Sequence, residues 1–154
     1  MATNERVSAG LNGLLADATI FYQKLRHYHW NVEGRAFFEL HAKFETLYTR
    51  WATAIDEIAE RILMIGGVPL HTLTSMLKEA RLVEDEGIPS AAEMVDAVLT
   101  DLAALHARAG DVIALAEKAE DRGTENALDT LRDDIEKDLW MLRAWSREAA
   151  RTCS

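Results

Sequence analysis

The sequence is poor in residues that break helices or cross-link chains. It has 154 residues, of which one is cysteine, two are proline and eight are glycine. The single cysteine, Cys153, cannot form an internal disulfide, so we expect an incidental thiol there. The scarcity of proline and glycine, together with abundant Ala, Leu, Glu and Arg, favours a mostly helical chain.

Long apolar runs are also missing. No stretch approaches the roughly 20 apolar residues that a membrane span needs, and the polar first residues, MATNERVSAG, are unlike a secretory signal. We therefore expect a cytoplasmic protein. The hydrophobic content of 49% is enough for the core of a single domain over residues 1–154. The formal net charge of −9 disfavours nonspecific attraction to nucleic acid and favours attraction of cations.

Four segments carry apolar residues spaced alternately by three and four positions, which is typical of amphipathic helices. These apolar stripes run over residues 7–28, 40–65, 95–116 and 128–145. The second stripe stops at Gly66, and the sequence SAAE from Ser90 to Glu93 predicts a capping box before the third. Gly123 and Thr124 are expected to separate the third helix from the fourth.

Four amphipathic helices of this length predict an all-α protein, a four-helix bundle, which a long crossover would make ferritin-like. The connection over residues 67–89 is too long for an antiparallel hairpin but suits a crossover along the bundle. The sequence TSMLKEARL within it predicts a short extra helix. A crossover is the ferritin-like arrangement, although spacing alone leaves a cytokine-like order of connections open.

The second helix carries four potential metal ligands on one stripe. With His41 at zero and 100° per residue, Glu45, Asp56 and Glu60 fall at about 40°, 60° and 100°, whereas the apolar side centres near about −100°. A solvated face would explain such a stripe. However, the stripe contains no cation, and Asp56 with Glu60 is a like-charge pair one turn apart. Such a pair destabilises a helix unless a cation lies between its members.

Apolar and small residues share this stripe, which favours burial against another helix over a solvated face. They are Phe38, Thr49, Ala52, Thr53, Ala59 and Leu63. A different flank carries Lys43, Arg50, Glu57 and Arg61, and we expect that flank to be the solvent-facing side.

One metal site cannot use both ends of this helix, because Glu45 and Asp56 are separated by about 16 Å of helix. If the same helix of an identical subunit crosses antiparallel, the His41 end of one chain meets the Glu60 end of the other. His29 could fold back to join His41. The Glu-x-x-His motif of single-subunit di-iron bundles does not occur in the sequence.

Three stretches, YHWNVEGRAFFELHAKFETLY, IDEIAERILMIGGVPL and EKDLWMLRAW, resemble Dps, the miniferritin family of DNA-binding proteins from starved cells. The resemblance covers nearly the whole chain. It implies a dodecameric hollow shell, a homododecamer of two-fold dimers, with a di-iron ferroxidase site between subunits. By position, it implies that His29 and His41 of one chain join Asp56 and Glu60 of the other. Glu45 stands where an aspartate is common in the family.

The resemblance also implies an activity: oxidation of Fe(II), with hydrogen peroxide as oxidant, and deposition of ferric oxide in the shell, which protects against oxidative damage. Imidazoles with carboxylates suit Fe(II), and hard oxygen ligands stabilise Fe(III). Tetrahedral zinc is a competitor for the same ligands. Trp30 would either take up oxidising equivalents near the iron, as in the family, or fill the core. We expect His27, His71 and His106 to be surface or packing residues.

The family's iron entrances lie at three-fold axes and are lined by acids near the junction of the last two helices. The candidates here are Glu117, Glu120, Asp121 and Glu125. An exposed acidic helix end is the alternative interpretation of these residues.

The alternative function is a nucleoid-associated protein that coats DNA and oxidises little iron. DNA-binding members of the family commonly carry lysine-rich tails, which neutralise phosphates and release counterions. Here Arg6 is the only cationic residue before the first apolar stripe, and Glu5 lies next to it. Near the C-terminus, a second basic group consists of Arg143, Arg147 and Arg151, which share one helix face. We therefore expect weak binding to DNA.

Overall fold

Helices account for most of the chain in the computed structural model, which describes residues 2–152. The helices are α1 (Thr3–Asn31), α2 (Phe37–Met64), α3 (Leu73–Glu79), α4 (Ala91–Lys118) and α5 (Arg122–Thr152). The described residues contain no strand, which confirms the all-α prediction. None of these helices is both long enough and apolar enough to cross a membrane. Cys153 lies outside the described residues.

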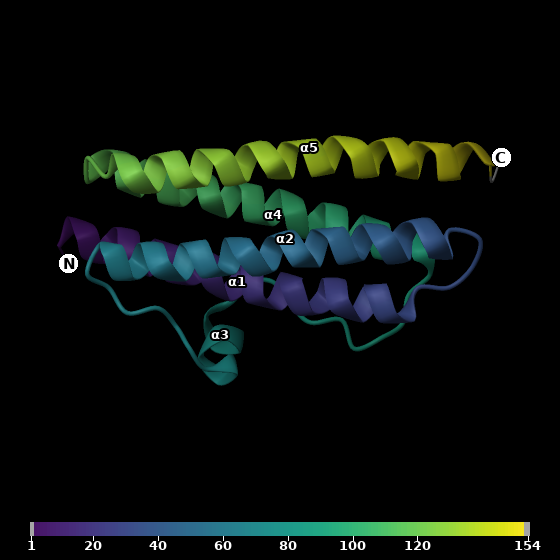
Figure 1. The fold of residues 1–154 in the computed structure, drawn as a ribbon, viewed down its shortest axis with the longest axis horizontal. Coiled ribbons are helices and arrows are strands. Elements are labelled where there is room, and N and C mark those ends of the chain that lie inside the picture. Colours follow the sequence, from purple (N-terminus) through teal and green to yellow (C-terminus); the bar gives the residue numbers. More distant parts are fainter. Residues whose placement is uncertain (1, 153–154) are drawn as a thin grey trace.

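The four long helices lie side by side as two antiparallel pairs, α1 with α2 and α4 with α5, and the pairs join where α1 packs on α4 (Figure 1). The connection from α2 to α4 runs the length of the bundle, so α2 and α4 point the same way. It carries the short helix α3, which packs against α1. The crossover and the extra helix are both as predicted, which excludes the cytokine-like order of connections.

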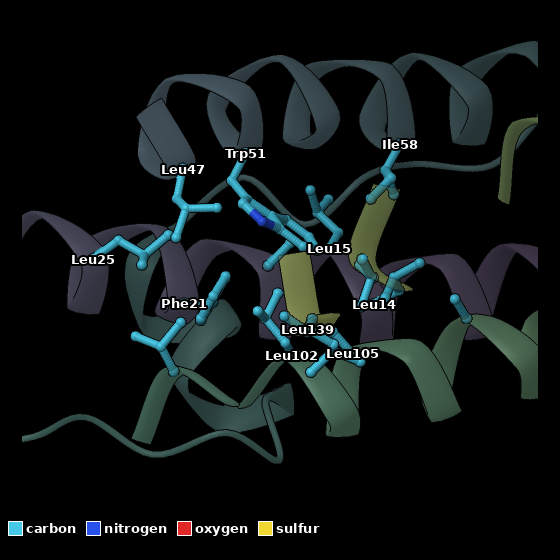
Figure 2. Packing of buried hydrophobic residues seen from close by; sticks show 14 of the residues in the cluster. Leu14, Leu15, Phe21, Leu25, Leu47, Trp51, Ile58, Leu102, Leu105 and Leu139 are labelled. Carbon is cyan, nitrogen blue, oxygen red and sulfur yellow. The ribbon is translucent and has the colours of Figure 1, made fainter. Parts of the chain in front are cut away.

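The core is built from the four predicted apolar stripes. Figure 2 shows Leu47, Trp51 and Ile58 reaching from α2 toward side chains of α1, α4 and α5. The ring of Trp51 meets that of Phe21 edge-on, with centroids 5.2 Å apart. Full burial of each such side chain contributes about 1.5–3 kcal/mol. Ala54, on the same stripe of α2, is half-buried.

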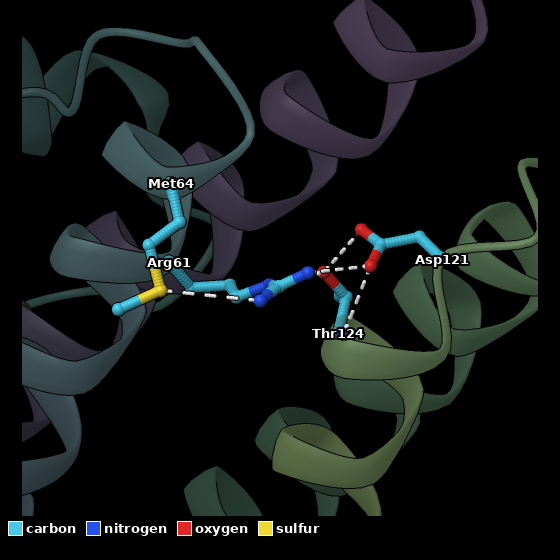
Figure 3. A network of polar contacts seen from close by, with 4 residues as sticks. All are labelled: Arg61, Met64, Asp121 and Thr124. Atoms are coloured by element: carbon cyan, nitrogen blue, oxygen red, sulfur yellow. Dashed lines mark hydrogen bonds and ion pairs between the residues drawn. The ribbon is translucent and has the colours of Figure 1, made fainter.

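The start of α5 differs from the prediction. The chain turns over residues 119–121, where Glu120 has a φ of +56°, and Gly123 lies inside the first turn of α5. Asp121 accepts hydrogen bonds from the backbone N–H and the hydroxyl of Thr124, so it caps the helix (Figure 3). The prediction that Gly123 and Thr124 separate the two helices is therefore wrong, because the Asp121 carboxylate starts α5 before them.

The flank of α2 that was predicted to face solvent does so only in part: Arg50 and Glu57 are exposed, but three of its residues pair with α5 or with the α4–α5 turn. Arg50 donates two hydrogen bonds to Asp138 of α5, at 3.0 and 2.9 Å, and the Lys43 ammonium lies 3.6 Å from the same carboxylate. Asp138 is only 2% exposed. Arg61 donates to Asp121 at 2.6 Å and to the Thr124 hydroxyl at 3.0 Å (Figure 3). These residues thus form polar contacts between α2 and the α4–α5 hairpin. Burying an aspartate such as Asp138 is costly unless a cation pairs with its carboxylate.

Candidate metal centre

His29 and His41 come together where α1 ends and α2 begins. Their rings are stacked, with centroids 3.8 Å apart and planes 13° from parallel. His29 is 9% exposed and His41 is half-buried. The turn between the helices passes through Gly34, whose φ of +100° suits glycine and strains other residues. The predicted approach of His29 to His41 is thus present within one chain.

Each histidine is held by the main chain of the other. Nδ1 of His29 lies 2.7 Å from the carbonyl oxygen of His41, and Nδ1 of His41 lies 2.7 Å from the carbonyl oxygen of His29. Because a carbonyl only accepts, both Nδ1 atoms must carry the hydrogen. In the neutral ring, Nε2 then keeps a lone pair free for a metal ion. Helix α1 ends at Asn31, and the last carbonyls of a helix lack partners within it.

Aromatic rings enclose the histidine pair. Phe37 stacks on His41, with centroids 4.9 Å apart and planes 20° from parallel. Tyr48 meets His29 edge-on at 5.3 Å, with planes 78° apart. Sequence reasoning missed both residues, although Phe37 and Tyr48 lie four before and seven after His41, which places all three on one side of α2.

The three acids of the candidate stripe on α2, Glu45, Asp56 and Glu60, are exposed in the single chain. Glu45 is one turn beyond His41, whereas Asp56 and Glu60 lie near the other end of α2, with about 22 Å of helix between His41 and Asp56. Within residues 2–152, no cluster of three or more His, Cys, Asp or Glu side chains is arranged to hold a metal ion. One chain therefore brings together His29 and His41 and keeps Asp56 and Glu60 apart from them.

The stripe that carries these acids faces away from the core of its own bundle, as predicted. Phe38 and Leu63, at opposite ends of this stripe, are 83% and 59% exposed. Both side chains are therefore accessible on the face that carries the acids.

Trp30 does not fill the core, because 56% of its surface is exposed. The guanidinium carbon of Arg26 lies 4.9 Å from the centre of its ring. The other histidines have surface or packing roles, as predicted. His27 donates from Nε2 to the Gly87 carbonyl oxygen, and His106 pairs with Glu136. His71 is exposed, and its Nδ1 donates to the carbonyl oxygen of Pro69.

The acids at the α4–α5 turn divide into two groups. Glu117, Glu120 and Glu125 line an open hollow of about 440 Å³ together with Arg122. Asp121 instead binds Arg61 and Thr124. Burial raises the pKa of Asp121, but the bonds from Thr124 and Arg61 outweigh it and hold the pKa below its usual range. Asp121 therefore has a structural role in this turn.

Comparison with known proteins places the chain in a family. The model of the ferritin-like domain matches residues 8–152. The DNA protection during starvation protein of Brevibacillus brevis is 43% identical over 139 residues, which are 90% of this chain and 93% of that protein. The crystal structure of a Dps protein from Bacillus brevis superimposes with a TM-score of 0.92 at 41% identity, covering 94% of this chain and 97% of that one. The chain belongs to the Dps family. 

Another Dps structure supports this assignment. The Dps protein from Vibrio cholerae O1, described as a member of the ferritin-like diiron-carboxylate superfamily, has a TM-score of 0.90 and 36% identity. The superposition covers 93% of this chain and 90% of that one. The predicted ferritin-like fold is confirmed by these matches.

Proposed function

We propose that this Dps protein is a ferroxidase and an iron store. It oxidises Fe(II), with hydrogen peroxide as the preferred oxidant, and deposits the ferric product inside a dodecameric shell. This reaction removes both reactants of hydroxyl radical formation, so it protects against oxidative damage. The observation that carries the proposal is the pair of reciprocal hydrogen bonds that leaves Nε2 of His29 and His41 free.

The remaining ligands come from a second subunit in this proposal. The exposed stripe of α2 carries His41 and Glu45 toward one end and Asp56 and Glu60 toward the other. When two such stripes cross antiparallel about a two-fold axis, each histidine pair meets the acids of the partner, and two equivalent sites form. The exposed Phe38 and Leu63 supply apolar area for this contact.

The donor set fits iron as the substrate. Neutral imidazoles bind Fe(II), and the carboxylates of Asp56 and Glu60 stabilise the higher charge of Fe(III). Glu45, one turn from His41, is a further ligand in this proposal. The same imidazoles and carboxylates suit tetrahedral zinc, which should therefore inhibit by competition.

A rate measurement tests the proposal. Anaerobic protein is mixed with Fe(II), and hydrogen peroxide or air is added separately while the ferric absorbance and the turbidity are followed. We expect faster oxidation with peroxide than with air and a ferric product that stays soluble. The His29→Ala/His41→Ala variant should lose the rapid phase, and His71→Ala, which removes an exposed histidine, should keep it. Equal rates and equal turbidity with and without protein would contradict the proposal.

DNA coating is the second candidate function, because the relative from Brevibacillus brevis is named for DNA protection. Arg143 and Arg147 are exposed on α5, and the side chain of Arg151 lies outside the described residues. The net charge of −9 disfavours DNA binding, because it repels the phosphates of DNA. We expect little retardation of duplex DNA in a gel at physiological salt with a chelator present; strong retardation under these conditions would favour the second candidate.

A further inference from the structure

We propose that Met64 is a peroxide-sensitive modification site. Hydrogen peroxide converts its thioether to a sulfoxide, and the sulfoxide oxygen then strengthens the contact between α2 and the α4–α5 turn through Arg61. The proposal shares its oxidant with the proposed function but does not need the iron site. It starts from the hydrogen bond that Nη1 of Arg61 donates to Sδ of Met64, at 3.9 Å (Figure 3).

Met64 is the most exposed of the methionines whose side chains the structure describes. It is the last residue of α2, and 70% of its surface is exposed, compared with 42% for Met141. Met76 is half-buried and Met94 is fully buried. Oxidation requires that the oxidant reach the sulfur, so peroxide should modify Met64 before the other three.

Met64 lies beside the stripe that the proposed function places between two subunits. With His41 at zero and 100° per residue, Met64 falls at about 140°, beyond Glu60 at about 100° and toward Arg61 at about 200°. Its side chain therefore belongs to the edge of the cationic flank of α2, where Arg61 contacts the α4–α5 turn.

The chemical step transfers one oxygen atom and two electrons. A lone pair of the Met64 sulfur attacks one oxygen of hydrogen peroxide, and the S–O bond forms as the O–O bond breaks. The departing hydroxide takes the proton from the transferred oxygen and leaves as water. Sulfur is oxidised and peroxide is reduced, without a metal ion. Dedicated reductases convert methionine sulfoxide back to methionine, so the modification is reversible.

The Arg61 guanidinium is a fixed donor next to this sulfur. Its Nε donates to the Thr124 hydroxyl at 3.0 Å, and its Nη2 donates to Asp121 at 2.6 Å. The main chain is also close, because a Cβ at Gly123 would lie 2.5 Å from Nη2 and 2.6 Å from Nη1. Among the residues that the structure describes, only Met64 accepts a hydrogen bond from Nη1. A thioether is a weak acceptor, so this donor is poorly used before oxidation.

Oxidation replaces the weak acceptor with a strong one. The sulfoxide oxygen projects from the sulfur and can approach Nη1 to the ordinary N–H···O distance of about 2.7–3.2 Å. A hydrogen bond from a charged donor is stronger than a neutral one. The bonds to Asp121 and Thr124 use the other two nitrogens of Arg61, so they are kept.

The exposure of Met64 decides the sign of the effect. Methionine oxidation destabilises a core, because it places a polar group among apolar side chains. At Met64 the new oxygen stays in contact with water, so it has no burial cost to offset the gain. Oxidation of Met64 should therefore stabilise the fold.

The first test locates the oxidation in the assembled, iron-free protein. A chelator removes iron, so that hydroxyl radicals do not form, and hydrogen peroxide is added and later destroyed with catalase. Tandem mass spectra of tryptic peptides locate the added oxygen atom and distinguish Met64 from Met76, which lie on the same peptide. Met64 should be oxidised before Met76 and Met141. Oxidation of Met141 while Met64 stays reduced would overturn the proposal.

The second test measures the thermal midpoint before and after the same treatment. Met64→Leu keeps an apolar side chain of similar size and cannot be oxidised, so its shift reports the other methionines. Relative to that shift, the unmodified protein should gain about 2–4 °C, as expected for one added hydrogen bond. Arg61→Ala removes the donor and should abolish the gain, measured against its own untreated sample.

Met64→Gln imitates the oxidised state without peroxide. Its side-chain carbonyl oxygen can accept from Nη1 of Arg61, so its midpoint should exceed that of Met64→Leu before any treatment. A midpoint that falls when Met64 is oxidised, or that rises equally in Met64→Leu, would overturn the proposal. Because all these measurements are made without iron, a failure of the ferroxidase proposal does not change their outcome.

Discussion

His29 and His41 each donate Nδ1–H to the main-chain carbonyl oxygen of the other, at 2.7 Å in both directions. Metal-binding histidines are commonly oriented by a side-chain carboxylate or a carbonyl acceptor elsewhere in the protein. Here the two rings orient each other through the backbone, and neither needs a third residue. The geometry of the pair therefore depends directly on how the turn between α1 and α2 is built.

Gly34→Ala tests this dependence. A Cβ at Gly34 would meet no atom within 4 Å, so the cost arises from the backbone, whose φ is +100°. Such strain costs about 1–3 kcal/mol, and relaxation of the turn would move His29 relative to His41. We expect a lower thermal midpoint and weaker binding of Co(II), measured by its visible absorbance.

Gly66→Ala is the matched control for that variant. Gly66 has a φ of +87°, also without atoms within 4 Å of a Cβ, but it follows the other end of α2. It should lower the thermal midpoint to a similar extent while retaining more of the Co(II) affinity than Gly34→Ala. An equal loss of affinity in both variants would indicate general loosening of the bundle and not a specific effect on the histidines.

Asp121→Asn tests the cap at the α4–α5 turn. The pKa of Asp121 is held below its usual range by Thr124 and Arg61 despite burial. The ionised carboxylate therefore stabilises the fold above its unfolded pKa of about 3.9, and this stabilisation is lost as the pH falls through the folded pKa. Asparagine keeps the size of the side chain but cannot ionise.

At neutral pH we expect Asp121→Asn to lower the stability by about 1.5–3 kcal/mol, the usual contribution of hydrogen bonds to a charged group. The difference from the unmodified protein should shrink as the pH falls below about 4, because Asp121 then takes up a proton in the unfolded chain before it does so in the folded protein, and should vanish below the folded pKa. Thermal unfolding from pH 7 to pH 3 measures this. Asp129→Asn, at an exposed carboxylate of α5, is the control and should change little. A difference that is constant with pH would contradict the ionised cap.

The helices and their buried faces were predictable because an apolar stripe is a local property of the chain. From Val7 to Tyr28 every residue of the predicted stripe is buried, and the spacing of three and four suffices to define that face. For the same reason, it was predictable that the stripe from His41 to Glu60 faces away from the core, since all of its residues belong to one helix.

Contacts between distant segments were not predictable in this way. Arg50 is exposed, as its place on the helix predicts, but its pairing with the buried Asp138, 88 positions away, was not predictable. The reciprocal bonds of His29 and His41 depend on which carbonyls lie where α1 ends and α2 begins. The positions of these carbonyls depend on the turn between α1 and α2, and the spacing of apolar residues does not specify the course of that turn.

The last prediction concerns the proposed metal site between two subunits. One variant carries His29→Ala and His41→Ala, and a second carries Asp56→Ala and Glu60→Ala. If each site takes histidines from one chain and acids from its partner, each variant alone should lose rapid Fe(II) oxidation. All four substituted side chains belong to the proposed site, and three of them are exposed or half-buried in the single chain.

Dissociating and reassembling the two variants together should restore part of the activity. In a mixed dimer, one site combines both sets of substituted residues, whereas the other combines intact histidines with intact acids and is complete. A site built within one subunit cannot be rescued, because every chain in the mixture carries a defect. Mixing is verified independently by labelling the two variants with different mass tags and recording native mass spectra. If native mass spectra show mixed assemblies but rapid Fe(II) oxidation is not recovered, the intersubunit site is contradicted, because the complete site that the mixed dimer should contain would then be inactive.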